Sequence, residues 1–226
     1  LTTPRFDPAT SRRRFRVALS DYAVTSFLPH LMSRLLALAP GISMEVSDMT
    51  SAAFSKLEAG DLEFSMQPSS WRLRHEDVPV GVRTTPLFDD EFACAVDCSV
   101  HRFDRMTRER YVELPHVVTR LHGWGTTAIA DVWNREGIRP RVALVAPGFT
   151  SALLALPGTP LVATVQRALI RRLARSLPIA VFDCPLPMDP LHQELYWHSR
   201  LEGDPAHRFV REQFVLAGQD VSDATA

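Results

Sequence analysis

Several short segments carry side chains and backbone groups that suit the binding of a small molecule. Ser20, Asp21 and Tyr22 directly follow an apolar run, where a helix begins. Backbone N–H groups at such a helix start, together with hydroxyl groups, can bind an anion. Ordinary N-capping by Ser20 or Asp21 explains the same residues equally well. The chemistry indicated is hydrogen bonding to a polar ligand.

Two later turns also precede expected helices. The first is a glycine-rich turn with the candidates Trp124, Gly125 and Thr126. Trp124 offers a flat apolar face, Gly125 allows close approach of the backbone, and Thr126 supplies a hydroxyl group. Its alternative is a plain turn with Trp124 on the core. A second turn contains the candidates Pro147, Gly148 and Phe149. Phe149 either stacks on an aromatic ligand or fills the core.

Two expected strands supply the remaining candidates. Gln67 ends one of them. Trp197 and His198 are neighbours on another, so they point to opposite faces and at most one of them can face a ligand. We take Trp197 as the candidate and His198 as a structural histidine.

Motifs for catalysis are absent from the sequence. It contains no nucleophile elbow, no P-loop and no dinucleotide-binding fingerprint after a strand. The histidines form no i, i+4 helical pair and no group with cysteines at ligand spacing. We therefore expect no enzymatic activity, no metal site and no cofactor.

The elements that position these residues begin with a β-α-β-α-β pattern. Alternating apolar residues predict strands at Phe15–Leu19, Ile42–Val46 and Leu62–Met66. A long helix from Ser20 to Leu38 tolerates Pro29 only in a first turn or at a kink. Ser51 is expected to cap a short helix that ends at Gly60. Right-handed crossovers make this sheet parallel.

The middle of the chain interrupts this alternation of strands and helices. Two extended segments, Val80–Phe88 and Glu91–Val96, follow each other without a helix. Strands and helices then alternate again, with strands at His116–Thr119, Val142–Val145, Leu161–Val165 and Ile179–Phe182. The helices between and after them are Thr107–Leu114, Thr126–Glu136, Phe149–Leu156 and Arg167–Leu177. The apolar runs Val142–Val145 and Leu161–Val165 are typical of buried strands.

The last part returns to the first domain. Pro185, Pro187 and Pro190 mark a linker, followed by a strand at Glu194–His198 and a helix at Pro205–Leu216. We expect one lobe from residues 1–86 and 188–226 and a second lobe from residues 87–187. The predicted fold is α/β, with two Rossmann-like lobes joined by two crossover strands, as in type 2 periplasmic binding proteins. Ligands of such sheets bind at the carboxyl ends of the strands, here in an inter-lobe cleft.

Composition limits the possible partners. The 226 residues are 46% hydrophobic and 23% charged, with a formal net charge of −1. A balanced chain has no general attraction for nucleic acid, and the basic cluster Arg12–Arg16 indicates either phosphate contact or a solvated linker end. No run is long enough to cross a bilayer. Three cysteines form no disulfide framework, and Cys94 is expected to be a buried inert thiol in a cytoplasmic protein.

An ordered set of segments resembles a known family. These segments are FRVALSDY (Phe15–Tyr22), ALAPGISMEV (Ala37–Val46), KLEAGDLEFSM (Lys56–Met66), RVALVAPGFTSALLALPGTPLVATV and LYWHSR (Leu195–Arg200). Together they resemble the effector-binding domain of LysR-type transcriptional regulators. The last two are most similar to the subgroup of nodulation-gene activators and regulators of nitroaromatic and naphthalene degradation.

The resemblance implies a ligand-sensing domain that controls DNA binding or transcription through a dimer. Effectors of the subgroup are aromatic acids, phenols or flavonoids, and the family places effector near Ser20–Tyr22. Operator DNA is bound by an N-terminal winged helix-turn-helix, expected upstream of Leu1. The resemblance implies a homodimer, and a tetramer in the full-length protein. Some aromatic-responsive relatives carry a bulkier polar residue at the position of Gly148, which implies a larger or different effector here. The helices Phe27–Leu38 and Thr126–Glu136 are the expected dimer surfaces.

Two other classes of function remain open. A periplasmic-type solute-binding protein would share the two-lobed fold, so the fold alone does not separate it from a regulator. An enzyme could use a carboxylate such as Asp21, but no second catalytic group accompanies it. We rank the regulator first and the enzyme last.

Overall fold

The computed structural model describes residues 6–69, 78–120 and 128–225, and the chain divides into two compact units. The first unit contains residues 1–89 and 192–226, and the second contains residues 90–191. The sequence placed the two crossings near Leu87 and Pro187, whereas the structure divides the chain after Asp89 and after Leu191. Each unit is built on its own sheet with helices on both faces, which is the predicted α/β architecture.

The first sheet has the order β2-β1-β3-β10-β4. Its strands are β1 (Arg14–Leu19), β2 (Ser43–Asp48), β3 (Phe64–Pro68), β4 (Val82–Asp90) and β10 (Leu191–His198). Its helices are α1 (Asp21–Ser26), α2 (Leu28–Leu38), α3 (Ala53–Ala59) and α9 (Pro205–Thr225), with a 3-10 turn at Ser199–Leu201. As predicted, β1 pairs in parallel with β2 and β3, while β10 is antiparallel to β3.

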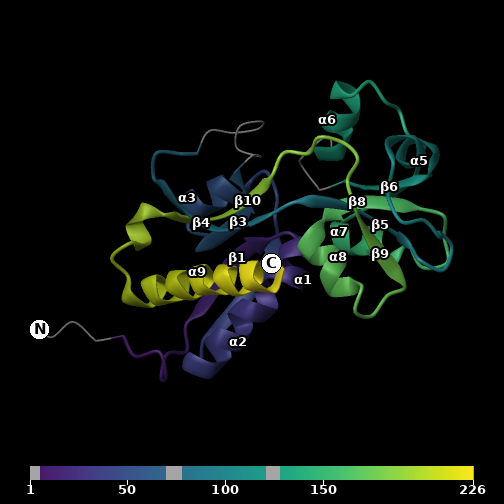
Figure 1. Ribbon diagram of the computed structural model, residues 1–226. Coiled ribbons are helices and arrows are strands. Elements are labelled where there is room, and N and C mark those ends of the chain that lie inside the picture. Colours follow the sequence, from purple (N-terminus) through teal and green to yellow (C-terminus); the bar gives the residue numbers. More distant parts are fainter. Residues whose placement is uncertain (1–5, 70–77, 121–127, 226) are drawn as a thin grey trace, which may run out of the picture. The chain divides into compact units, whose positions relative to one another are not determined.

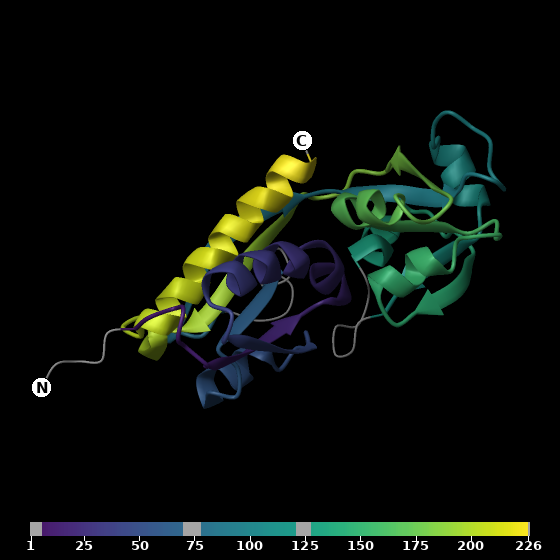
Figure 2. The same cartoon turned by 90° about the horizontal axis from the view of Figure 1, so that it is seen from below.

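The helices cover the first sheet unequally. Figures 1 and 2 show α9 beside α2 on one face, with α3 on the other. The ring of Phe214 on α9 lies 5.6 Å from Phe27 and 5.1 Å from Phe64, so aromatic side chains join α9 to the sheet. On the α3 face, Phe54 packs against Tyr196 of β10 at 5.3 Å.

Local sequence explains most helix ends. Pro29 lies in the first turn of α2, where its missing N–H is unimportant, so the predicted long helix is two helices that meet at Phe27. Gly60 ends α3 with φ of 83°, a left-handed conformation that glycine adopts without strain. The prediction that Ser51 caps α3 is wrong, because the N-cap is Ala52 and makes no side-chain hydrogen bond.

The second sheet has the order β7-β6-β8-β5-β9. Its strands are β5 (Phe92–Asp97), β6 (His116–Thr119), β7 (Val142–Ala146), β8 (Val162–Gln166) and β9 (Ile179–Asp183). Its helices are α5 (Arg108–Glu113), α6 (Ala128–Arg135), α7 (Phe149–Leu154) and α8 (Arg167–Leu173). Figure 1 shows α5 and α6 on one face and α7 and α8 on the other.

The two apolar runs of the second sheet have opposite environments. β8 is central and fully buried, as predicted for Leu161–Val165. The prediction of burial for Val142–Val145 is wrong, because β7 is an edge strand. Val142, Leu144 and Val145 expose 43, 38 and 46% of their surface. Exposed apolar side chains on an edge strand favour contact with another segment or another chain. No described segment of the second unit buries these side chains.

Candidate functional site

The carboxyl end of β1 in the first unit carries the first group of candidates. Ser20 caps α1, and the backbone N–H of Ala23 donates to its Oγ at 3.3 Å. Asp21 follows in the first turn and is partly buried. Tyr22 exposes no surface, so it belongs to the core of the unit. Capping therefore accounts for Ser20, whose hydroxyl retains a donor for a ligand.

Gln67 lies level with Ser20 on the neighbouring strand. β1 and β3 pair with Ala18 opposite Ser65, and two residues further this register brings Ser20 beside Gln67. Gln67 exposes only 3% of its surface, and its Nε2 has no hydrogen-bond partner among the described residues. A buried amide without a partner costs about 1–3 kcal/mol, so this side chain calls for an explanation.

Two serine hydroxyls on the same face share this state. Ser47 of β2, Ala18 of β1 and Ser65 of β3 form one row across the sheet. The face is the α3 face, because Ala18 packs with Phe54 and Leu57 of that helix. Within the described part of the chain, the Oγ atoms of Ser47 and Ser65 are buried and unpaired. The strand ends of the first unit thus present a cluster of unsatisfied polar groups, consisting of Gln67, Ser65 and Ser47.

Trp197 is not part of this cluster. β10 runs antiparallel to β3 with Tyr196 opposite Ser65, so Trp197 lies at the level of Phe64, at the opposite end of the parallel strands from Gln67. Its ring lies under the guanidinium of Arg211 on α9, 4.8 Å from the ring centroid. Alternation along the strand correctly separates Trp197 from His198, but it does not show at which end of the sheet Trp197 lies.

In the second unit, the turn after β7 has the predicted form. Pro147 is exposed, and Gly148 begins α7 in an extended conformation, with its N–H donating to Ser151 Oγ at 3.2 Å. Phe149 exposes 7% of its surface, which favours the core-filling alternative. The candidates Trp124, Gly125 and Thr126 lie outside the described residues.

Sequence reasoning missed Gln166, which ends the central strand β8. Its side chain is 3% exposed, and its Oε1 has no partner among the described residues. Each unit therefore has a buried glutamine with an unpaired amide atom at the end of a central strand. A polar residue that closes the apolar run Leu161–Val165 was the available signal.

The buried histidines are structural. His207 on α9 stacks on Phe64 at 4.2 Å, and its Nε2 donates to the Glu63 carbonyl oxygen at 3.3 Å. Arg211 donates to its Nδ1 at 3.1 Å. Burial, with the nearby Arg211 charge, lowers the pKa of His207 to about 4. Burial also lowers the pKa of His116, whose Nε2 donates to the Tyr111 carbonyl oxygen at 2.7 Å.

The basic cluster near the start of the chain is paired with acids of the first unit. Arg13 pairs with Asp204, Arg14 with Glu45 and Arg16 with Glu63. Over the described residues, no three histidine, cysteine, aspartate or glutamate side chains gather in a way that could hold a metal ion. No helix in the same residues has the length and apolarity needed to span a membrane.

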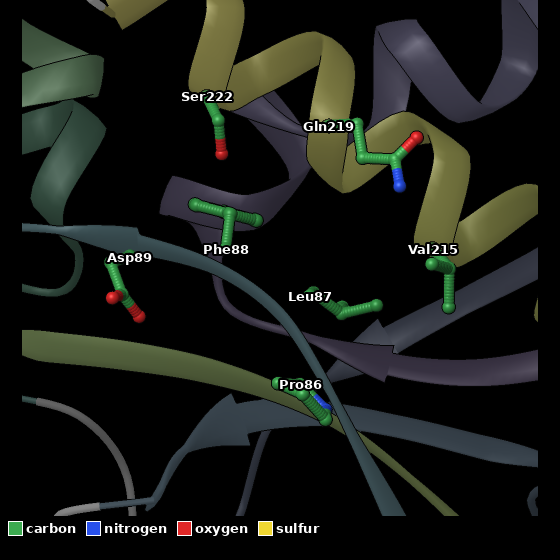
Figure 3. Close-up of a pocket in the computed structure, with 7 residues that line it drawn as sticks. All are labelled: Pro86, Leu87, Phe88, Asp89, Val215, Gln219 and Ser222. Atoms are coloured by element: carbon green, nitrogen blue, oxygen red, sulfur yellow. The ribbon is translucent and has the colours of Figure 1, made fainter.

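A groove of about 590 Å³ lies in the first unit between β4 and α9 (Figure 3). It is lined by Pro86, Leu87, Phe88, Asp89, Val215, Gln219 and Ser222. β4 is the edge strand of the first sheet and is separated from β3 by β10, so the groove is distinct from the strand-end cluster around Gln67. No pattern in the sequence predicts this groove.

Two α/β units, each with a central parallel strand pair and an antiparallel strand, define a domain of the periplasmic-binding-protein type. Residues 8–217 match the family described as the LysR substrate binding domain. The chain belongs to this family, as its sequence resemblance predicted, and the match favours a regulator over a solute-binding protein.

Similar proteins agree with this assignment. Nodulation protein D 2 of Rhizobium tropici is 30% identical over 210 residues, which cover 92% of this chain and 64% of that protein. Nodulation protein D 1 of Rhizobium leguminosarum bv. phaseoli is 31% identical over 212 residues, covering 92% and 65%. The chain therefore spans a little under two thirds of the length of these relatives.

Solved structures show the same fold. The regulatory domain of MexT, a transcriptional activator in Pseudomonas aeruginosa, aligns with a TM-score of 0.79 at 22% identity and covers 92% of this chain and 100% of that one. A probable transcriptional regulator from the same organism aligns with a TM-score of 0.81 at 26% identity, covering 93% and 70%.

Proposed function

We propose that the chain is the ligand-sensing part of a LysR-type transcriptional regulator and that a small, aromatic effector binds at the strand ends of its units. The observation that supports a site there is the unpaired, buried Nε2 of Gln67. An effector with a carboxylate or hydroxyl oxygen would accept a hydrogen bond from it, and Ser20 would add a second. Effector binding then controls operator DNA through the dimer, with the DNA bound by an N-terminal domain outside residues 1–226.

Gln67→Leu is expected to weaken effector binding about tenfold to a hundredfold, the effect of losing one buried hydrogen bond. The change removes a buried Nε2 group that has no partner in the described residues, so the free energy of unfolding should stay the same or rise. Calorimetry with a panel of aromatic acids, phenols and flavonoids measures the affinity, and denaturation measures the stability.

Gln213→Leu is the matched control. Gln213 is a glutamine of similar burial, 5% exposed, on α9 rather than at a strand end. Its replacement should leave effector affinity unchanged. Equal losses of affinity in both variants would remove Gln67 from the site. A wild-type chain that binds no member of the panel would refute an aromatic effector.

Exposed apolar side chains support a dimer. Leu36 and Leu38 on α2 expose 55 and 51% of their surface. In the second unit, exposed residues gather on β7 and α7, namely Val142, Leu144, Val145 and Leu154. The helix Thr126–Glu136 offers less support as a dimer surface, because Ile129, Val132 and Trp133 of α6 are buried in their own core and no described residue of α6 is an exposed large apolar side chain. We infer that a second copy of the chain covers the surfaces on α2 and β7.

Leu36→Glu and Val145→Glu are each expected to raise the dimer dissociation constant about tenfold or more, because each buries an unpaired carboxylate. Sedimentation velocity over a concentration series measures this constant. Val80→Glu changes a valine that is 96% exposed and should have no effect. A wild-type chain that stays monomeric at high concentration would contradict the dimer.

A further inference from the structure

The second unit holds two cysteines, Cys94 and Cys184, that pack in the same core cluster and interact with each other. Cys94 is in the middle of β5 and exposes no surface. Cys184 directly follows β9, is partly buried and packs against the same core cluster. β5 and β9 pair with Cys94 opposite Phe182, so Cys184, two residues further, lies diagonally from Cys94 on the same face.

A chain of hydrogen bonds leads to this pair. Trp133 Nε1 lies 3.1 Å from Tyr111 Oη, Tyr111 Oη lies 2.9 Å from Thr164 Oγ1, and Thr164 Oγ1 lies 3.7 Å from Cys94 Sγ. An indole N–H can only donate, so it sets a direction for the chain. Tyr111 then donates to Thr164, Thr164 donates to Cys94, and the Cys94 thiol donates to Cys184. Each group in the chain therefore donates to the next one, and the last donation is to the Cys184 sulfur.

The two thiols therefore differ in acidity. The hydrogen bond from Cys94, together with the backbone N–H of Leu186, lowers the pKa of Cys184 although burial opposes it. Burial raises the pKa of Cys94 well above its ordinary value, and Cys184 adds to the effect. A thiolate is the reactive form of cysteine. The partly exposed Cys184 is therefore suited to be the nucleophile, and the buried Cys94 to be the proton donor beside it.

We propose that Cys184 and Cys94 form a peroxide-reactive thiol pair, in which Cys184 attacks the oxidant and Cys94 then closes an intramolecular disulfide. In the first step the Cys184 thiolate attacks one peroxide oxygen, the O–O bond breaks, and Cys184 becomes a sulfenic acid while hydroxide leaves and takes up a proton. In the second step the Cys94 sulfur attacks the Cys184 sulfur and the S–O bond breaks. The thiol proton of Cys94 leaves with the hydroxide as water.

The overall reaction balances as two thiols and one hydrogen peroxide giving one disulfide and two waters. The two sulfurs lose two electrons, which reduce the O–O bond. Diagonal Cα atoms in a regular strand pair are about 7–8 Å apart, somewhat beyond the span of a disulfide. Cys184 lies just outside β9, where strand pairing no longer fixes its backbone, and the disulfide requires this backbone to shift toward Cys94. The expected inert thiol at Cys94 is buried but is placed to act on a reactive neighbour.

The disulfide would tie together the two segments through which the second unit connects to the first. Cys94 lies shortly after the crossing at Asp89, and Cys184 lies shortly before the crossing at Leu191. Oxidation would therefore restrain both connections at once. This proposal concerns only the second unit and does not depend on the effector site.

One equivalent of hydrogen peroxide is expected to remove two of the three thiols of the chain from reaction with maleimide after denaturation. A thiol reductant should restore them. Peptide mass mapping should find the Cys94 and Cys184 peptides joined and lighter by two hydrogens. Dimedone present during oxidation should label Cys184 and not Cys94, a result that requires no variant.

Four variants separate the roles. Cys184→Ser should abolish the disulfide, and Cys94→Ser should leave a sulfenic acid on Cys184. Thr164→Val breaks the hydrogen-bond chain at nearly constant volume and should slow the oxidation of Cys184. Cys98→Ser, at the exposed cysteine, should still form the disulfide at the wild-type rate. A disulfide through Cys98, a bond between two chains, or Cys184 oxidised to sulfinic acid beside a free Cys94 would each overturn the proposal.

Discussion

Phe214→Ala is expected to lower the free energy of unfolding by about 3–5 kcal/mol, the usual cost of removing a buried aromatic ring. Phe214 exposes no surface, and its ring packs against Phe27 and Phe64, so its loss leaves a cavity where α9 meets the first sheet. Urea denaturation measures the loss. Hydrogen exchange should show the weakened protection in peptides of the first unit, because the second unit has its own core cluster.

Phe209→Ala provides the comparison within the same helix. Phe209 is only partly buried and has Phe6 as its aromatic neighbour, at 5.6 Å. Less packing is lost there, so we expect a change of about 1 kcal/mol. If the two alanine variants were equally destabilised, the Phe214 cluster would not be the main attachment of α9 to the sheet.

Stability is also expected to fall by about 3 kcal/mol as the pH is lowered from about 6.5 to about 4. The folded chain holds the pKa of His207 at about 4, whereas the unfolded chain has the ordinary value near 6.5. Between these values the unfolded state binds more protons, so acid favours unfolding. The stabilisation is complete above pH 6.5 and is lost as the pH falls through this window.

The structural reason is that both ring nitrogens of His207 are already used. Nε2 donates to Glu63, and Nδ1 accepts from Arg211, so a second ring proton would face a cation. Asp204, which caps α9 and pairs with Arg13, has a lowered pKa and contributes at more acidic pH. Urea midpoints at several pH values measure the slope.

His207→Gln should flatten this pH dependence while lowering the stability at pH 7.5. The contribution of His116, whose pKa is also lowered, remains in that variant and gives the residual slope. A variant with the full wild-type slope between pH 6.5 and 4 would assign the effect to another group.

Most elements could be predicted because their signals are local. Alternation at Phe15, Val17 and Leu19 and the left-handed Gly60 need no information from elsewhere in the chain. The burial of β7 could not be predicted in this way, because burial depends on the strand order, and an edge strand can have the same apolar sequence as a central one. The length of α9 was underestimated at Gly218, a residue that usually ends helices.

Gly218 lies inside α9 for a reason of packing. A Cβ at this position would lie 2.5 Å from the carbonyl oxygen of Leu87, so the glycine allows α9 to approach β4 closely.

The candidate site shows the same division between local and distant information. Ser20 could be found from the strand-to-helix junction, whereas the position of Trp197 depends on the register of β10 against β3, which lie far apart in sequence.

The first unit is discontinuous, and this has a consequence for how the protein is made. Synthesis proceeds from the N-terminus, so residues 90–191 leave the ribosome and can fold while β10 and α9 are still inside its exit tunnel. Until then, Phe15, Phe27 and Phe64 lack the helix that covers them, and the half-built sheet is exposed to aggregation and to chaperones. We expect a chain truncated after residue 191 and released from the ribosome to have a protease-resistant second unit and a protease-sensitive first unit.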